Sequence, residues 1–208
     1  FHSKSPMPTI YQLKPAFQNL LRPLVRSLAA AGVTANQVTV AAFVLSAATG
    51  GALWWQPSSR AVLLAVPVVC FVRMALNAID GMLAREFAQK SKLGAILNEI
   101  GDVLSDAALY LPFASIGAIS TPLVVGVVLL AVVSEMTGVV AGQIGASRRY
   151  DGPAGKSDRA LVFGLLGLLG GCGVALGAWT NWLLAVELAL LALTIFNRAR
   201  GALREAAR

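Results

Sequence analysis

A polar segment lies between two long apolar stretches of this chain. It runs from Asn77 to Asp106 and reads NAIDGMLAREFAQKSKLGAILNEIGDVLSD. The apolar sequence on each side is long enough for a membrane span. Ionisable side chains in such surroundings are costly and are by default functional. We therefore expect the chemistry of this protein to reside in this segment.

The spacing of the polar residues places them on two helix faces. Asn77, Asp80 and Ala84 follow at steps of three and four and so share one face of a helix. A second set follows at steps of four: Gly94, Asn98, Asp102 and Asp106. Two antiparallel helices joined by a short polar loop could turn these faces toward each other. Divalent cations such as Mg2+ prefer oxygen ligands and often bridge phosphates, so the pattern predicts a metal site for a phosphate ester near one membrane face.

The same segment resembles the motif of the CDP-alcohol phosphotransferases. That family carries Asp-x2-Asp-Gly-x2-Ala-Arg-x8-Gly-x3-Asp-x3-Asp, and this chain aligns with it without a gap. Six of the eight positions match, namely Asp80, Gly81, Ala84, Arg85, Gly94 and Asp102. Asn77 and Asn98 stand where the first and third Asp belong.

The resemblance implies an all-α integral membrane enzyme with six transmembrane helices. Such an enzyme transfers a substituted phosphate from a CDP-alcohol donor lipid, often CDP-diacylglycerol, to an acceptor alcohol and releases CMP. It implies that Mg2+ or Mn2+ is held by Asp80 and Asp102, helped by Asn77 and Asn98. Asp80 and Asp102 would be the catalytic carboxylates, with Asp102 as the general base for the acceptor hydroxyl.

The resemblance also assigns the residues that bind the CDP group of the donor. Gly81, Ala84 and Gly94 would admit the cytidine. Arg85 would bind or orient the diphosphate. The expected place of such an enzyme is phospholipid biosynthesis.

The two asparagines change what the site can hold. The matched set offers two carboxylates where four Asp would offer four, so we expect weaker metal binding and one ion in place of two. One alternative is a non-catalytic membrane protein that binds a nucleotide lipid or a partner without turnover, which Asn77 and Asn98 favour. Another is a polar helix pair that only packs. A small-solute transporter would suit the buried charges, but the sequence shows no repeat-related broken helices.

Composition places the whole chain, residues 1–208, in one membrane domain. It is 57% hydrophobic and 13% charged, which is typical of a polytopic membrane protein. The net charge is +7, but the basic residues sit at span ends rather than in one patch, so we predict no nucleic-acid partner. Cys70 and Cys172 lie in apolar sequence, so we predict no disulfide framework.

The apolar pattern divides the chain into an interfacial helix and six spans. Residues 10–30 are amphipathic at helical spacing and predict a helix that lies in the membrane interface. Spans of roughly 20 residues fit a bilayer. They are predicted near 36–55, 61–84, 93–116, 121–146, 159–177 and 180–197, followed by a cytoplasmic tail over 198–208.

Charge and aromatic residues predict the orientation. Tryptophan gathers at one set of span ends, at positions 54, 55, 179 and 182. Of the seventeen basic residues, all but Arg60 and Arg73 fall toward the opposite ends, which are therefore predicted to be cytoplasmic. Both termini and the mouth of the candidate site would then face the cytoplasm. We expect an integral protein of a bacterial inner membrane.

Three charged residues are predicted to lie deep in the spans. Arg73, Asp106 and Glu135 each fall about 16–18 Å from a cytoplasmic span end, at the helical rise per residue. An arginine between two carboxylates is tolerated there, so we predict that Arg73 pairs with Asp106 and Glu135. The alternative is that Arg73 or Asp106 contacts substrate. Glu187 lies nearer the tryptophan side, and we expect it to reach the interface by snorkelling.

The segment from Arg148 to Arg159 predicts an anion pocket at the cytoplasmic side. Its basic residues lie among Gly and Pro: Arg148, Arg149, Lys156 and Arg159. In the resembling family, basic residues in this region bind the acceptor's phosphate when it has one, and Lys156 and Arg149 are favoured here. The alternative is an ordinary positive-inside loop. Glycines at steps of three and four over 164–173 predict close helix packing, either internal or at a homodimer face.

Overall fold

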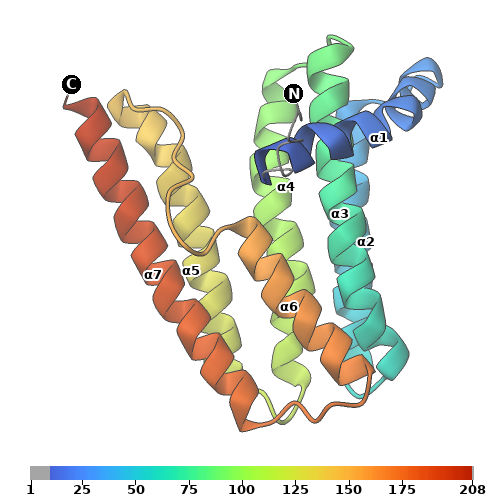
Figure 1. The fold of residues 1–208 in the computed structure, drawn as a ribbon, viewed down its shortest axis with the longest axis vertical. Helices are drawn as coiled ribbons and strands as arrows, with labels where there is room; N and C mark the ends of the chain where they lie inside the picture. Colours follow the sequence, from blue (N-terminus) through green and yellow to red (C-terminus); the bar gives the residue numbers. More distant parts are fainter. Residues whose placement is uncertain (1–9, 208) are drawn as a thin grey trace, which may run out of the picture. The chain divides into compact units, whose positions relative to one another are not determined.

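The computed structural model describes residues 10–207, with side chains from residue 15 onward. The predicted domain also includes residues 1–9 and 208, which lie outside the described part. Within the described range the chain is helical and has no strand. Figure 1 shows α1 (Ile10–Ala30), α2 (Ala35–Trp55), α3 (Arg60–Glu86), α4 (Lys92–Tyr110), η1 (Leu111–Ser115), α5 (Thr121–Val140), η2 (Ala141–Ile144), α6 (Lys156–Gly171) and α7 (Ala178–Ala206).

Four of the described helices are long and apolar enough to cross a membrane. They are α2, α3, α5 continued through η2, and α7. Helix α4 is 19 residues long but carries Lys92, Glu99, Asp102 and Asp106. Helix α6 has only 16 residues, fewer than the roughly 20 that span a bilayer. The structure thus accounts for four of the six predicted spans by length and composition.

Local capping explains where the helices begin. The backbone N–H of Thr34 donates to Gln37 Oε1 at 2.9 Å, and the N–H of Gln37 donates to Thr34 Oγ1 at 3.3 Å, which starts α2. The N–H of Gly155 donates to Asp158 Oδ2 at 2.8 Å at the start of α6. Arg159 therefore lies in the first turn of α6, at the predicted start of the span over 159–177.

The chain folds into two compact units, each described by itself. The first unit contains residues 1–42 and 72–101. In its core, α1 contributes Val25, α2 contributes Val38 and the second half of α3 contributes Met82. The predicted helix over 10–30 is present, and its Leu20 and Leu24 are exposed. Its position in a membrane interface stays a prediction.

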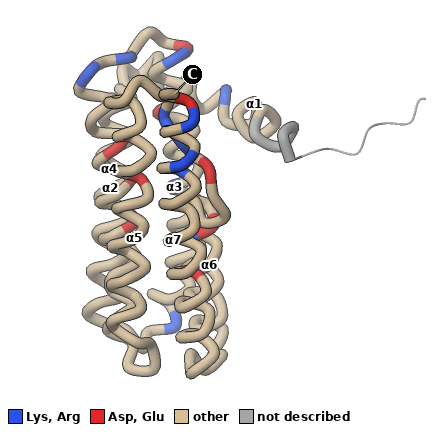
Figure 2. Tube along the Cα trace, turned by 90° about the vertical axis from the view of Figure 1, so that its left-hand side faces the viewer, with Lys and Arg blue, Asp and Glu red and all other residues tan. Residues whose placement is uncertain are grey.

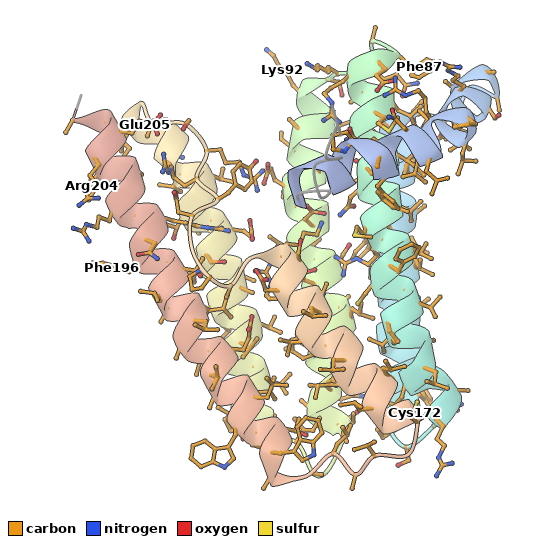
Figure 3. All side chains as sticks on the ribbon, in the orientation of Figure 1. Phe87, Lys92, Cys172, Phe196, Arg204 and Glu205 are labelled. Carbon is orange, nitrogen blue, oxygen red and sulfur yellow. The ribbon has the colours of Figure 1, made fainter. Side chains whose placement is uncertain are left out.

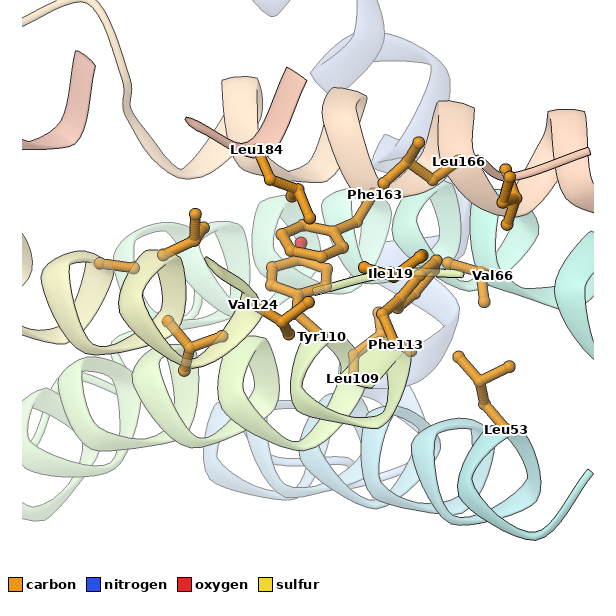
Figure 4. Packing of buried hydrophobic residues seen from close by; sticks show 14 of the residues in the cluster. Leu53, Val66, Leu109, Tyr110, Phe113, Ile119, Val124, Phe163, Leu166 and Leu184 are labelled. Atoms are coloured by element: carbon orange, nitrogen blue, oxygen red, sulfur yellow. The ribbon is translucent and has the colours of Figure 1, made fainter. Parts of the chain in front are cut away.

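The second unit contains residues 43–71 and 102–208 and has the larger core. The ring of Tyr110 stacks on that of Phe163 with centroids 4.3 Å apart and 7° between the planes (Figure 4). Phe113 meets Phe163 edge-on at 5.2 Å. Helices α5 and α7 of this unit run side by side (Figure 1). These contacts hold α6 against the part of α4 that follows Asp102.

Two features of the second unit bear on the sequence predictions. A Cβ on Gly167 of α6 would lie 2.7 Å from the carbonyl oxygen of Leu63, so this glycine serves internal packing on α3. The homodimer stays a prediction. Helix α7 continues through Ala206, so the residues from 198 form its last turns rather than a frayed tail.

Candidate functional site

The first part of the motif lies on the second half of α3, in the first unit. Asn77 is half-buried and Asp80 is 5% exposed. Asp80 Oδ2 accepts a hydrogen bond from Thr39 Oγ1 of α2 at 2.9 Å. Thr39 also donates to the carbonyl of Ala35 at 3.1 Å, so the hydroxyl is held between helix backbone and carboxylate. The sequence analysis missed Thr39, although it is a polar residue one turn into the predicted first span.

The motif glycines lie beside polar side chains of the same unit. The guanidinium of Arg85, which is exposed, folds back so that its nitrogens lie 3.1 and 3.2 Å from where a Cβ on Gly81 would be. A Cβ on Gly94 would lie 2.8 Å from Asn36 Oδ1. These glycines therefore make room for polar groups, and their predicted role in admitting cytidine, with that of half-buried Ala84, stays a prediction.

The second part of the motif lies along α4. Asn98 and Asp102 are one turn apart on this helix. Asn98 belongs to the first unit, whereas Asp102 is the first residue of α4 that belongs to the second unit. Asp102 Oδ1 forms an ion pair with Lys156 Nζ of α6, and the two side chains are 28% and 30% exposed. The sequence analysis placed Lys156 with the acceptor-phosphate candidates and did not foresee that it meets the candidate general base.

The oxygen donors of the motif are of the kind that Mg2+ and Mn2+ prefer. Among the described residues, no group of three or more His, Cys, Asp or Glu side chains gathers as a metal site. The physical reason is that Asn occupies two motif positions, which leaves two carboxylates. Mg2+ commonly needs only one or two carboxylates when substrate phosphates complete its shell. Asp80, which is buried and accepts a hydrogen bond from the Thr39 hydroxyl, is a suitable ligand of this kind.

A buried ion-pair network lies next to Asp102 in the second unit. Arg159 Nε and Nη2 donate to Asp106 Oδ2 at 3.1 and 2.9 Å. Arg159 Nη2 also donates to Glu135 Oε1 at 3.3 Å. Arg159 is thus a partner of both carboxylates, which the sequence analysis did not foresee. Arg73 is buried in the first unit, and its pairing with Asp106 and Glu135 stays a prediction.

Glu135 is the hub of this network. Its Oε2 lies 3.4 Å from Arg148 Nη2 and 3.3 Å from Arg198 Nη1. Arg198 Nη1 also donates to the carbonyl of Ser134 at 2.6 Å. The sequence analysis missed Arg198 because it fell in the predicted tail. The continuation of α7 through this position is what brings it to α5.

Arg149 is held in the loop between α5 and α6 by two carboxylates. Its Nε lies 2.7 Å from Asp151 Oδ2, and its Nη1 lies 2.5 Å from Glu205 Oε2. The hydrogen bond from Arg149 lowers the pKa of the Asp151 carboxyl below its ordinary value. In Figure 2 the basic side of α7 lies toward its C-terminal end, and Figure 3 labels Arg204 and Glu205 there.

An open groove of about 630 Å³ runs along this end of α7. It is lined by Arg149, Asp151, Asn197, Arg200, Gly201, Arg204 and Glu205. Three arginines and two carboxylates thus line the groove, and none of its residues belongs to the motif of α3 and α4.

Similarity to known proteins extends beyond the motif to most of the chain. The family model of CDP-alcohol phosphatidyltransferase matches residues 32–196. The chain is 47% identical over 195 residues to the inner membrane protein YnbA of Escherichia coli K12, covering 94% of this chain and 96% of that protein. It is 31% identical over 172 residues to phosphatidylinositol phosphate synthase of Mycolicibacterium smegmatis, covering 77% and 73%.

Solved structures share the fold at lower identity. The crystal structure of Mycobacterium tuberculosis phosphatidylinositol phosphate synthase with CDP-DAG bound has a TM-score of 0.69 at 20% identity and covers 88% of this chain and 92% of that one. The same synthase in complex with manganese and citrate gives 0.67 at 20% identity, covering 89% and 88%. The four apolar helices and the inner-membrane relative together indicate an integral membrane protein. The chain belongs to the CDP-alcohol phosphatidyltransferase family.

Proposed function

We propose that this protein is a metal-dependent phosphatidyltransferase of phospholipid biosynthesis. It moves the phosphatidyl group of a CDP-alcohol donor, which we take to be CDP-diacylglycerol, to an acceptor alcohol and releases CMP. The observation that carries the proposal is the gap-free motif from position 77 to 102, which keeps Asp80, Arg85 and Asp102 inside a family match of residues 32–196. A relative with the same fold bound to CDP-DAG supports the choice of donor.

The reaction needs a base and a leaving group at one phosphorus. The acceptor hydroxyl oxygen forms a bond to the phosphorus that bears the diacylglycerol, and its proton passes to Asp102. The bond from that phosphorus to the bridging oxygen breaks, and CMP leaves with the electron pair. A bound divalent ion supplies positive charge at the phosphate oxygens. Asp80 and Asp102, with Asn77 and Asn98, would hold it.

Asp102 forms an ion pair that must open before it can act as the base. The ammonium of Lys156 forms an ion pair with the Asp102 carboxylate. Lys156 must turn aside for the acceptor hydroxyl to reach Asp102, and both side chains are exposed enough for this movement. Arg85, exposed at the end of α3, would bind the donor's diphosphate.

For the membrane, we propose six spans with both termini and the site on the cytoplasmic side. Helix α4 with η1 covers residues 92–115, which is long enough for a bilayer. Two of its charged residues meet α6, where Lys156 pairs with Asp102 and Arg159 with Asp106. The short α6 would cross with the residues up to Leu176, which is itself buried. The Lys and Arg residues at one set of span ends support a cytoplasmic location for those ends.

The second candidate is a family member that binds a nucleotide lipid without turnover. Asn77 and Asn98 favour it, because they remove two carboxylates from the motif. The ion pair between Lys156 and Asp102 favours it as well, because it occupies the candidate base.

Release of CMP separates the two candidates. The purified full-length protein is incubated in detergent–lipid micelles with CDP-diacylglycerol, Mg2+ or Mn2+, and a panel of acceptor alcohols. A transferase releases CMP only when an acceptor and a divalent ion are both present, and excess chelator stops it. Binding of CDP-diacylglycerol without CMP release from any acceptor would support the non-catalytic candidate.

A further inference from the structure

Every basic residue that was predicted to bind an acceptor phosphate has a carboxylate partner inside the second unit. Lys156 pairs with Asp102, which has already been described. The remaining pairs are Arg148 with Glu135, Arg149 with Asp151 and Glu205, and Arg159 with Asp106 and Glu135. Arg198, the further arginine of the network, also meets Glu135. Five basic residues thus face five acidic ones, a net charge of zero.

Two of these arginines, Arg159 and Arg198, are too deeply buried for a substrate to reach. The side chains of Arg159 and Arg198 are each 2% exposed. A phosphate could reach them only by displacing Glu135 or Asp106. Separating one partner from a buried ion pair is strongly unfavourable, because it leaves an uncompensated charge.

The space beside these arginines is also too small. A cavity lined by Asp106, Tyr110, Glu135 and Arg159, among apolar residues, has a volume of about 10 Å³. That is room for a single water molecule. Arg159 Nη1 has no hydrogen-bond partner among the described residues. One water molecule could accept its hydrogen bond. A space that admits one water molecule does not admit a phosphate group.

The open groove at the end of α7 does have room for a phosphate. However, its arginines stand among Asp151 and Glu205, and Arg149 already binds both. Neither Asp102 nor Lys156 lines it. A phosphate bound there would lie outside the residues that are proposed to activate the acceptor hydroxyl.

From this charge balance we infer that the acceptor is an alcohol without a phosphate group, such as a neutral polyol or a zwitterionic alcohol. The inference rests on the proposed transferase function. A phosphate monoester carries a charge of about −1.5 to −2 at neutral pH, and no basic side chain of the network is left to balance it. The acceptor class would differ from one suggested by a relative named for making phosphatidylinositol phosphate.

Matched acceptor pairs test the inference in the unaltered protein. Glycerol is compared with glycerol 3-phosphate, and inositol with inositol phosphate, by the rate of CMP release. We expect kcat/KM to be at least roughly tenfold higher for the unphosphorylated member, a preference that 1.4 kcal/mol would produce. Preference for the phosphorylated member overturns the inference and leaves the transferase function standing. If Arg200→Met and Arg204→Met then abolish that preference, the groove is the phosphate site.

Direct binding gives a readout that does not depend on turnover. Calorimetric titration of the purified protein with glycerol 3-phosphate should show no binding up to millimolar concentration. Micromolar binding overturns the inference even if no acceptor is ever converted. Absence of CMP release from every acceptor rejects the proposed function and the inference with it, whereas micromolar binding of glycerol 3-phosphate rejects the inference alone, so the two failures are distinguishable.

Discussion

The close approach of α2 to α4 is the packing contact that can be tested most sharply. A Cβ built on Gly50 would lie 1.9 Å from the carbonyl oxygen of Ala108 and 3.3 Å from the Cα of Leu109. A Cβ on the neighbouring Gly51 would meet nothing within 4 Å. Both residues are inside the same helix. Gly50→Ala and Gly51→Ala therefore add the same methyl group to one helix, but only the first adds it at a backbone contact.

The magnitudes follow from two opposing effects. Alanine is favoured over glycine in a helix interior by about 1 kcal/mol. Gly51→Ala should therefore stabilise the protein by up to that amount. At Gly50 the helices must separate by about 1 Å to relieve the contact, and overpacking of a well-packed region costs about 1–3 kcal/mol or more. Because the obstacle is a backbone carbonyl rather than a flexible side chain, we expect a net destabilisation of about 1–2 kcal/mol for Gly50→Ala.

The free energy of unfolding is measured by titration with sodium dodecyl sulfate in mixed micelles, with the fluorescence of the tryptophans as the signal. The predicted order of stability is Gly51→Ala, then the unaltered chain, then Gly50→Ala. Ala108 follows Asp106 on α4, so the same displacement should weaken the pairing with Arg159. Equal stability of the two variants would refute the α2–α4 crossing described for the second unit.

Three further predictions concern the network, the metal and the topology. Arg159→Met should destabilise the protein by about 3–5 kcal/mol, because buried Asp106 loses two hydrogen bonds and Glu135 loses one of its three arginines, whereas Arg200→Met on the exposed side of α7 should change the same free energy of unfolding by less than about 0.5 kcal/mol. Asn77→Asp combined with Asn98→Asp should tighten Mn2+ binding in a titration and keep or raise CMP release; two tight ions already present in the unaltered protein would contradict this. Cysteines placed at Ser59 and Ser91 should react with a membrane-impermeant reagent from opposite sides, and labelling of both from one side would overturn the proposed topology.

The continuous apolar runs made four helices predictable from the sequence. α2, α3, α5 and α7 each begin within two residues of a predicted span. The placement of the motif on two helices was predictable too, because its residues follow at the three- and four-residue steps of a helix. The end of α7 was not, because the basic residues from Arg198 onward resemble a tail. Arg198 is nevertheless 2% exposed, because Glu135 and the carbonyl of Ser134 neutralise and satisfy it.

The partners of the charged residues were the least predictable part of the site. Depth along the spans indicated that Asp106 and Glu135 need a cation, but depth does not say which helix supplies it. Arg159 supplies it because capping by Asp158 starts α6 early enough to include it. Glu187 shows the same limit: snorkelling to the interface was predicted, and the residue is instead 3% exposed. Such contacts depend on tertiary packing, which spacing along one helix does not contain.

The most direct test of the transferase account is CMP release by carboxylate variants. Asp80→Asn and Asp102→Asn are compared with the unaltered protein and with Asp158→Asn, an exposed position whose side chain caps α6 and where an amide oxygen can replace the carboxylate. The account predicts metal-dependent CMP release by the unaltered protein and by Asp158→Asn. It predicts no release by Asp80→Asn or Asp102→Asn, although both remain folded. Full turnover by either folded variant would contradict the assigned site.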